Sequence, residues 1–119
     1  MKISILGLNS DSVFFLKRSS FMKKDHDLSF HAFDDRKIQN TFKKEFSNIQ
    51  TPWNLSDVLK ECDLLLNCSG LKNLPNSITI LEDNKIDCPI IDFSTNKKYS
   101  IKLFNNSTLP QNNIIHAMS

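Results

Sequence analysis

Residues 2–12 read KISILGLNSDS, and this stretch decides the fold class. A short aliphatic run ends at Gly7 and is followed at once by a cluster of small polar residues. The pattern predicts a strand at Lys2–Leu6 that turns into a helix capped by Ser10 or Asp11. The apolar residues that continue this helix at helical spacing are Val13, Phe14, Leu16 and Phe21.

The same alternation of short apolar runs and helical stretches continues along the chain. Further strands are predicted at Leu28–Phe33, Phe46–Gln50, Asp63–Cys68, Pro89–Phe93 and Asn113–His116. Strands that alternate with helices form a parallel sheet, and right-handed crossovers leave few arrangements for it. We therefore predict an α/β fold with a doubly wound, mainly parallel, Rossmann-like sheet, and residues 1–119 fit a single domain.

Helices are expected between these strands. Asn54, with Asp57 three residues on, resembles a capping box, and Pro75 is typical of a first helical turn. The apolar residues four apart that an earlier helix would bury are Ile38, Phe42 and Phe46. The last expected helix lies within residues 97–110 and carries Tyr99, Leu103 and Phe104.

Composition and charge exclude several classes of function. The 15 basic and 13 acidic residues are interspersed, which leaves no basic face for a nucleic acid. No run approaches the roughly 18 apolar residues of a membrane span and no secretory signal opens the chain, so we expect a cytoplasmic location without membrane contact. Cys62, Cys68 and Cys88 lie in or beside apolar segments, so we expect buried, reduced thiols and no metal site.

Gly7 opens the loop in which a dinucleotide-binding protein carries Gly-x-Gly-x-x-Gly between a strand and a helix. Only the first of these glycines is present. Asn9 stands where the second glycine lets the backbone approach a pyrophosphate, and Ser12 can replace the third. Asp11 places a carboxylate where it would repel that pyrophosphate. Two interpretations stay open: Gly7, Asn9 and Ser10 bind a cofactor, or they form only a turn and a helix cap.

Further candidate ligands follow the second and fourth strands. Asp34 follows Gly7 by 27 residues, near the roughly 20-residue spacing at which an acid binds the ribose of NAD. Arg36 offers a site for the 2′-phosphate of NADP. Cys68 and Ser69 stand at the carboxyl edge, where open α/β sheets bind ligands. Acidic residues at strand ends are also common in solvated loops, which is the alternative for Asp34.

The ends of the last two predicted strands contain motifs that resemble those of a known family. The order of elements is similar to the N-terminal NAD(P)-binding domain of prephenate and arogenate dehydrogenases, of the 6-phosphogluconate-dehydrogenase-like superfamily. In that family a strand ending in Asp-x-x-Ser-x-Lys precedes a strand ending in His-Pro-Met. The corresponding residues here are Asp92, Ser94, Lys97 and His116-Ala117-Met118. The chain departs from the family in its Gly-poor loop and in Ala117, which replaces the proline.

The resemblance implies a cofactor, a reaction and two catalytic residues. The cofactor would be NAD or NADP, and the reaction would be hydride transfer from a prephenate-like substrate in tyrosine biosynthesis. His116 would accept a hydrogen bond from the substrate hydroxyl, and Ser94 would orient His116. The chain ends at Ser119, before the helical domain that dimerises in this family, so we expect no catalysis by this chain alone and a homodimer or partner domain. Without the resemblance, His116 is a structural residue and Ser94 a helix cap.

Two other readings remain. The chain is a stand-alone Rossmann module that binds no dinucleotide and acts through protein association, with an exposed apolar patch at the last strand, Tyr99 and Phe104. Or it belongs elsewhere in the superfamily, near 6-phosphogluconate dehydrogenases or pyrroline-carboxylate reductases. The backbone N–H groups above Gly7 distinguish a cofactor site from an associating module, since they are either open to solvent or filled by Asn9 and Asp11.

Overall fold

Six parallel strands form one sheet in the computed structural model, which describes residues 1–19, 28–70 and 72–117. The strand order is β3-β2-β1-β4-β5-β6, so the chain starts in the middle of the sheet and winds outward in both directions. The strands are β1 (Lys2–Leu6), β2 (Ser29–Phe33), β3 (Ile49–Gln50), β4 (Leu64–Asn67), β5 (Ile90–Asp92) and β6 (Ile114–His116). The predicted doubly wound Rossmann-like sheet is confirmed, and each strand lies within its predicted segment. The third strand is shorter than predicted, because Phe46 caps the end of α2 and only Ile49–Gln50 pair with β2.

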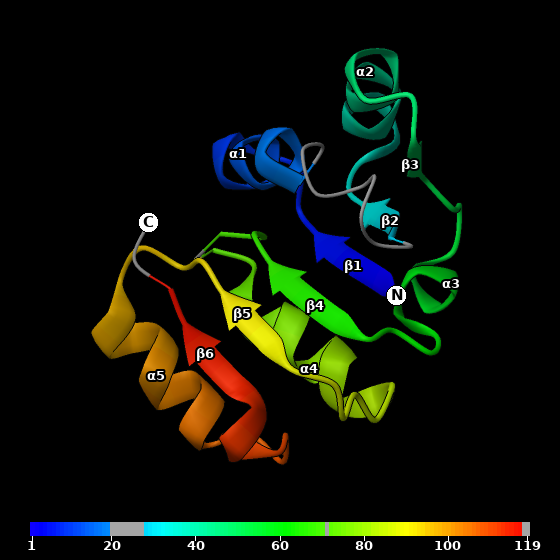
Figure 1. Ribbon diagram of the computed structural model, residues 1–119. Coiled ribbons are helices and arrows are strands. Elements are labelled where there is room, and N and C mark those ends of the chain that lie inside the picture. The colour runs from blue at the N-terminus through cyan, green and yellow to red at the C-terminus, as the bar shows by residue number, and fades with distance from the viewer. Residues whose placement is uncertain (20–27, 71, 118–119) are drawn as a thin grey trace.

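Helices lie on both faces of this sheet (Figure 1). They are α1 (Ser10–Ser19), α2 (Arg36–Glu45), α3 (Leu55–Leu59), α4 (Leu74–Asp83) and α5 (Lys97–Asn105), with a 3₁₀ turn η1 (Gln111–Asn113) before β6. One core lies under α1 and α2 and includes Ile3, Ile5, Leu16, Phe30 and Leu66. The other lies under α3, α4 and α5 and includes Leu59, Leu65, Leu81, Ile90 and Phe104. The sheet is therefore buried on both faces, which explains the apolar runs of β4 and β5.

Helix α2 buries a residue that the apolar pattern did not select. Ile38 is exposed, whereas Gln39 is 1% exposed. The Gln39 amide donates to the carbonyl oxygens of Ala32 and Pro52, and its oxygen accepts a hydrogen bond from Arg36. Because each polar group has a partner, burial of this side chain costs little. The prediction that Ile38 is buried was wrong.

Other predictions about apolar side chains need correction. Phe14 in α1 is 63% exposed and lies 5.0 Å from the Arg18 guanidinium, and Phe21 lies outside the described residues. Phe104 was expected in an exposed patch and is fully buried, while Tyr99 on the same helix is exposed. A helix buries only the side facing the sheet, and here that side is set by Phe104.

The helix caps differ from those predicted, although the helices are in place. Asn9 rather than Ser10 or Asp11 caps α1, since Val13 N–H donates to the Asn9 carbonyl in the first helical hydrogen bond. Asn96 caps α5 by accepting from Tyr99 N–H, so Ser94 is not the cap. Asn54 precedes α3 without a side-chain cap hydrogen bond, so the predicted capping box does not form.

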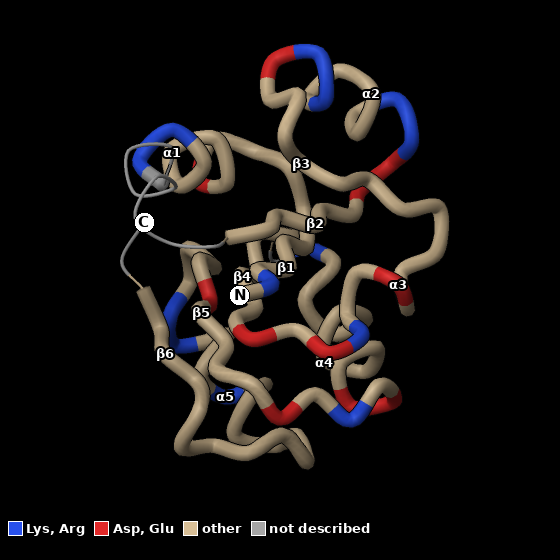
Figure 2. The backbone as a smooth tube through the Cα atoms, turned by 45° about the vertical axis from the view of Figure 1, so that its right-hand side comes forward, with Lys and Arg blue, Asp and Glu red and all other residues tan. Residues whose placement is uncertain are grey.

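Charged side chains of both signs occur on the same parts of the surface. Figure 2 shows Lys and Arg on α2 with Asp and Glu beside them at the two ends of the helix, and both signs along the connections that lead into β4 and β5. This distribution agrees with the balanced charge of the sequence. Among the described residues, no helix is both long enough and apolar enough to cross a membrane.

Gly7 ends β1 in close contact with the end of β4. Its φ of +89° lies in the left-handed region. A Cβ atom at this position would lie 2.6 Å from the carbonyl oxygen of Cys68 and 2.8 Å from the Cα of Ser69. Only glycine therefore allows the two strand ends to meet this closely.

Gly7→Ala should lower the free energy of unfolding by about 4 kcal/mol, because strain at positive φ adds to a clash with backbone that cannot move aside. Gly70→Ala is the matched control, since Gly70 also has a positive φ (+85°) but nothing lies within 4 Å of the place that a Cβ atom would take there. We expect that variant to lose about 1 kcal/mol. Urea denaturation measures both, and equal losses would show that the contact with Cys68 has no role.

Candidate functional site

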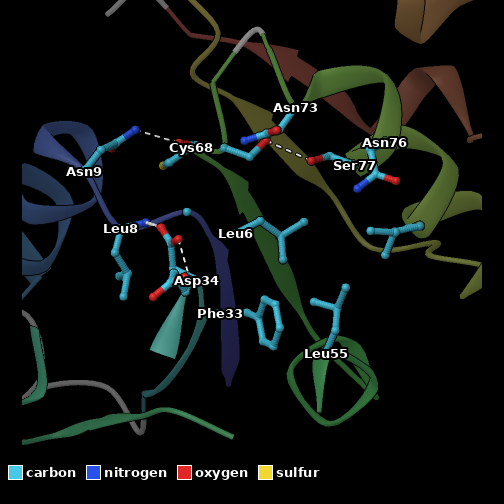
Figure 3. A pocket seen from close by; sticks show the side chains of 14 residues that line it. Leu6, Leu8, Asn9, Phe33, Asp34, Leu55, Cys68, Asn73, Asn76 and Ser77 are labelled. Carbon is cyan, nitrogen blue, oxygen red and sulfur yellow. Dashed lines mark hydrogen bonds between the residues drawn. The ribbon is translucent and has the colours of Figure 1, made fainter. Parts of the chain in front are cut away.

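A cavity of about 310 Å³ opens at the carboxyl edge of β1, β2 and β4. Its apolar part is formed by Leu6, Phe33 and Leu55, whose side chains point toward one another in Figure 3. Ile80 also lines the cavity. Its polar part comes from the loop after β1, from Asp34 and from the start of α4, where Asn73, Asn76 and Ser77 lie. An apolar floor with a few polar groups on its rim is the usual form of a small-molecule site.

Asp34 joins this cavity to the loop after β1. Its Oδ2 accepts a hydrogen bond from Leu8 N–H at 2.8 Å, and its Oδ1 accepts one from Asp35 N–H at 2.6 Å. The carboxylate is half-buried and each of its oxygens keeps a lone pair for a further donor. Its position at the end of β2 is the one from which an acid binds ribose hydroxyls in this fold class.

Asn9 closes the end of α1 that points toward the cavity. Its Oδ1 accepts from Asp11 N–H at 3.0 Å and from Ser12 N–H at 3.3 Å. Its Nδ2 donates to the carbonyl oxygen of Cys68 at 2.6 Å, and its own N–H donates to Ser12 Oγ at 2.7 Å. Asn9 and Ser12 thus cap each other's backbone N–H groups, as in a capping box.

These hydrogen bonds decide how well a dinucleotide fits. A pyrophosphate in this fold class is held by the N–H groups at the start of the first helix. Here two of those groups, on Asp11 and Ser12, already donate to Asn9. The cavity and Asp34 suit the nucleoside part of a dinucleotide, whereas the loop in this conformation does not suit its pyrophosphate.

The structure brings five of the seven expected cofactor residues to this cavity: Gly7, Asn9, Asp34, Cys68 and Ser69. Ser10 and Arg36 do not line it. The Arg36 guanidinium lies 4.1 Å above the Trp53 ring and donates to the carbonyl oxygen of Thr51 at 2.8 Å. The Arg36 guanidinium is therefore already engaged with partners that do not line the cavity.

Cys68 lies in the wall of the cavity as a protonated thiol. Burial, with the nearby carboxylates of Asp11 and Asp92, raises the pKa of Cys68 to about 12. The thiolate is the nucleophilic form of cysteine, so Cys68 is unreactive at neutral pH.

A second polar cluster surrounds Asp92 at the ends of β4, β5 and β6. The Asp92 side chain is fully buried, and its Oδ1 accepts from Asn67 Nδ2 at 3.0 Å and from Ser94 Oγ at 2.8 Å. Its Oδ2 faces His116 Nδ1 at 3.4 Å. The His116 ring packs edge-on against Phe104, with the ring centroids 5.6 Å apart. The two candidate catalytic residues, His116 and Ser94, thus meet on one carboxylate.

A chain of hydrogen bonds links the cavity to this cluster. Ser77 Oγ and Ser69 Oγ lie 2.9 Å apart, and Ser69 Oγ donates to Asn67 Oδ1 at 2.8 Å. Asn67 then donates to Asp92. Asn67 was not selected from the sequence, and Asp92 was noted there only as part of the family resemblance, without a role of its own. Both are polar residues that end apolar strands, which is the signal that could have identified them.

The carboxylate should fix the tautomer of His116. With Asp92 Oδ2 as an acceptor, the proton of the neutral ring belongs on Nδ1, which leaves Nε2 free to accept a hydrogen bond. In Asp92→Asn the amide oxygen should keep its donors, Asn67 and Ser94, and the amide nitrogen should face His116. We expect the ring proton to move to Nε2 in this variant, as measured by nitrogen NMR at a pH where the ring is neutral.

Ser94→Ala is the control for this experiment, because it removes a donor to the same carboxylate and leaves Oδ2 in place. The Nδ1–H form should persist in that variant. The assignment is wrong if the wild-type ring already carries its proton on Nε2.

Comparisons with known proteins agree on the fold only. No protein-family model and no curated protein matches the chain. The structure is similar to the crystal structure of malate dehydrogenase from Plasmodium falciparum, with a TM-score of 0.61 and 16% sequence identity. The shared fold is the Rossmann-like α/β fold. The likeness covers 98% of this chain and 44% of the malate dehydrogenase chain, so this chain spans less than half of that enzyme's length.

The comparison leaves the family open. It shows a Rossmann-like fold and does not single out the prephenate dehydrogenases. A likeness at this level of identity carries no information about a substrate.

Proposed function

We propose that the chain is a nucleotide-binding domain of the dehydrogenase type that takes the nucleoside part of NAD in the cavity beside Asp34. The observation that carries this proposal is the position of Asp34, between the loop after β1 and the apolar floor of the cavity. An adenine ring packs on the apolar floor while the ribose hydroxyls donate to the carboxylate. Because Arg36 is held by Trp53 and Thr51, NAD is preferred to NADP.

NAD binding is weak with the loop after β1 in this conformation. A dinucleotide has to displace the Asn9 amide oxygen from the N–H groups of Asp11 and Ser12, or leave its pyrophosphate in solvent. Hydrogen bonds to a charged group contribute roughly 1.5–3 kcal/mol each, so the loss of two accounts for a large fall in affinity. We expect a Kd for NAD of about 1 mM, near 4 kcal/mol of binding.

The finer part of the proposal follows the resemblance to prephenate dehydrogenases. It assigns His116 the hydrogen bond to the hydroxyl group of a prephenate-like substrate and Ser94 a place beside it. Asp92 supports this role, because a proton on Nδ1 leaves Nε2 as the acceptor. Catalysis requires a substrate-binding domain, supplied by a partner or by a longer protein.

Asn9→Gly tests the proposal directly. Glycine at an N-cap costs only a few tenths of a kcal/mol relative to Asn, so the variant should fold. The change frees two N–H groups and lets the backbone approach a phosphate, so affinity for NAD should rise at least about tenfold. Affinity for adenosine, which has no phosphate, should stay unchanged. Isothermal titration calorimetry with NAD, NADP and adenosine measures these differences.

Ser10→Gly is the matched control, because Ser10 adjoins Asn9 but does not line the cavity. It should leave all three affinities unchanged. Asp34→Ala should abolish binding of both adenosine and NAD. The proposal fails if adenosine and NAD do not bind the wild type or Asn9→Gly at ligand concentrations of about 10 mM.

A different function, protein association, is favoured by one observation. Strand β6 is an edge strand of the sheet, and Ile115 on it is 55% exposed. An exposed edge strand with an apolar side chain can pair with another chain. Sedimentation of the wild type beside Ile115→Lys separates this function from nucleotide binding, since only association would depend on residue 115.

A further inference from the structure

Two cysteines that are far apart in the sequence meet at the amino edge of the sheet, opposite to the candidate site. Cys62 lies two residues before β4 and Cys88 two residues before β5. These strands are paired in parallel, with Leu65 opposite Ile90. The register therefore places the segments that lead into the two strands, residues 62–63 and 88–89, side by side. We call them the entry segments, and the Sγ atoms of Cys62 and Cys88 lie 2.9 Å apart.

Tight helix ends fix both entry segments. Glu61, directly before Cys62, has a φ of +54°, and Lys85, after α4, has a φ of +51°. At the end of α4, Lys85 N–H donates to the Glu82 carbonyl and Ile86 N–H to the Leu81 carbonyl, the pair of bonds that defines a Schellman motif. The backbone that carries the two sulfurs is thus held in place.

The two thiols differ in acidity and in access. The hydrogen bond from the Cys88 thiol lowers the pKa of Cys62 to about 7 against the opposing effect of burial, with further help from Ser4 and the Lys2 ammonium group. The same contact, together with burial, raises the pKa of Cys88. Cys62 is half-buried and lines a groove of about 500 Å³, whereas Cys88 is buried.

We propose that Cys62 and Cys88 form a redox-active dithiol, in which Cys62 attacks a small-molecule disulfide from the groove and Cys88 completes an intramolecular disulfide. The geometry carries this proposal, because the sulfurs are already in contact and only Cys62 lines the groove. Disulfide exchange requires access, a thiolate and a second thiol within reach, and the three requirements are met here.

The reaction with glutathione disulfide balances in two steps. First, the Cys62 thiolate bonds to one glutathione sulfur, the S–S bond of glutathione breaks, and one glutathione thiolate leaves. Second, Cys88 bonds to Cys62 Sγ, the mixed disulfide breaks, a second glutathione leaves, and the Cys88 proton passes to a leaving thiolate. Two cysteine thiols are oxidised by two electrons, and one glutathione disulfide is reduced to two thiols.

Cys68 provides a matched control within the same chain. It is buried, and its raised pKa of about 12 leaves no thiolate at neutral pH. Under the proposal it stays reduced while the other two cysteines react. Cys68 does not line the groove beside Cys62.

The test is oxidation of the full chain by glutathione disulfide near pH 7, followed by thiol titration and mass spectrometry. The wild type and Cys68→Ala should each lose two thiols without retaining glutathione, and proteolytic peptides should be linked between Cys62 and Cys88. Cys88→Ala should retain one glutathione on Cys62, and Cys62→Ala should retain its thiols. Dithiothreitol should reverse each change.

Two further measurements sharpen the result. In Cys88→Ala, Cys62 loses the hydrogen bond that lowers its pKa, so less of it is thiolate at pH 7. The rate of adduct formation at pH 7 should therefore fall by about fivefold relative to the first step of the wild type. Closing the loop between residues 62 and 88 should raise the Tm of the oxidised wild type by about 10 °C.

Two results would overturn the proposal: a wild type that keeps three free thiols, or one that retains glutathione on Cys62 without closing the disulfide. Peptide mapping of the wild type decides this even where a variant fails to fold, as checked by circular dichroism.

Discussion

The contact between Gly7 and the backbone of Cys68 and Ser69 is the constraint on which the carboxyl edge of this protein depends. It brings the ends of β1 and β4 together at a distance that no side chain permits. The loop after Gly7 then has to pass over β4, which places the Asn9 amide within reach of the Cys68 carbonyl oxygen. The Asn9 cap of α1 lies at this close approach, whereas Asp34 is placed beside the loop by the pairing of β2 with β1 and by the hydrogen bond from Leu8 N–H.

The same constraint explains why the loop is closed to an anion. A helix start offers a few N–H donors, and either a ligand or the protein itself can satisfy them. With glycine at position 9 the donors would face solvent. Asn9 is held at Cys68 by its Nδ2, and its Oδ1 accepts hydrogen bonds from the N–H groups of Asp11 and Ser12 and from Ser12 Oγ. The protein gains a stable helix start and loses the phosphate cradle.

Much of the fold could be predicted from the sequence, because strands buried on both faces leave unmistakable apolar runs and Gly7 marks the first turn. The individual side-chain contacts, such as those of buried polar residues and of cysteines far apart in the sequence, were harder to predict. Gln39 is buried because the carbonyl groups of Ala32 and Pro52 happen to lie beside it, and periodicity contains no such information. Cys62 and Cys88 meet only through the register of β4 and β5, which the spacing of cysteines along the chain does not reveal.

The hydrogen bonding of the cluster around Asp92 is incomplete. Among the described residues, Asp92 Oδ2 and His116 Nδ1 are buried atoms without a hydrogen-bond partner, although they face each other at 3.4 Å. Unpaired buried polar atoms cost free energy, so a small movement of the His116 ring toward Asp92 would be favourable. The remaining donors to Asp92, from Asn67 and Ser94, are already in place, so the contact with His116 is the one hydrogen bond of this cluster that is still incomplete among the described residues.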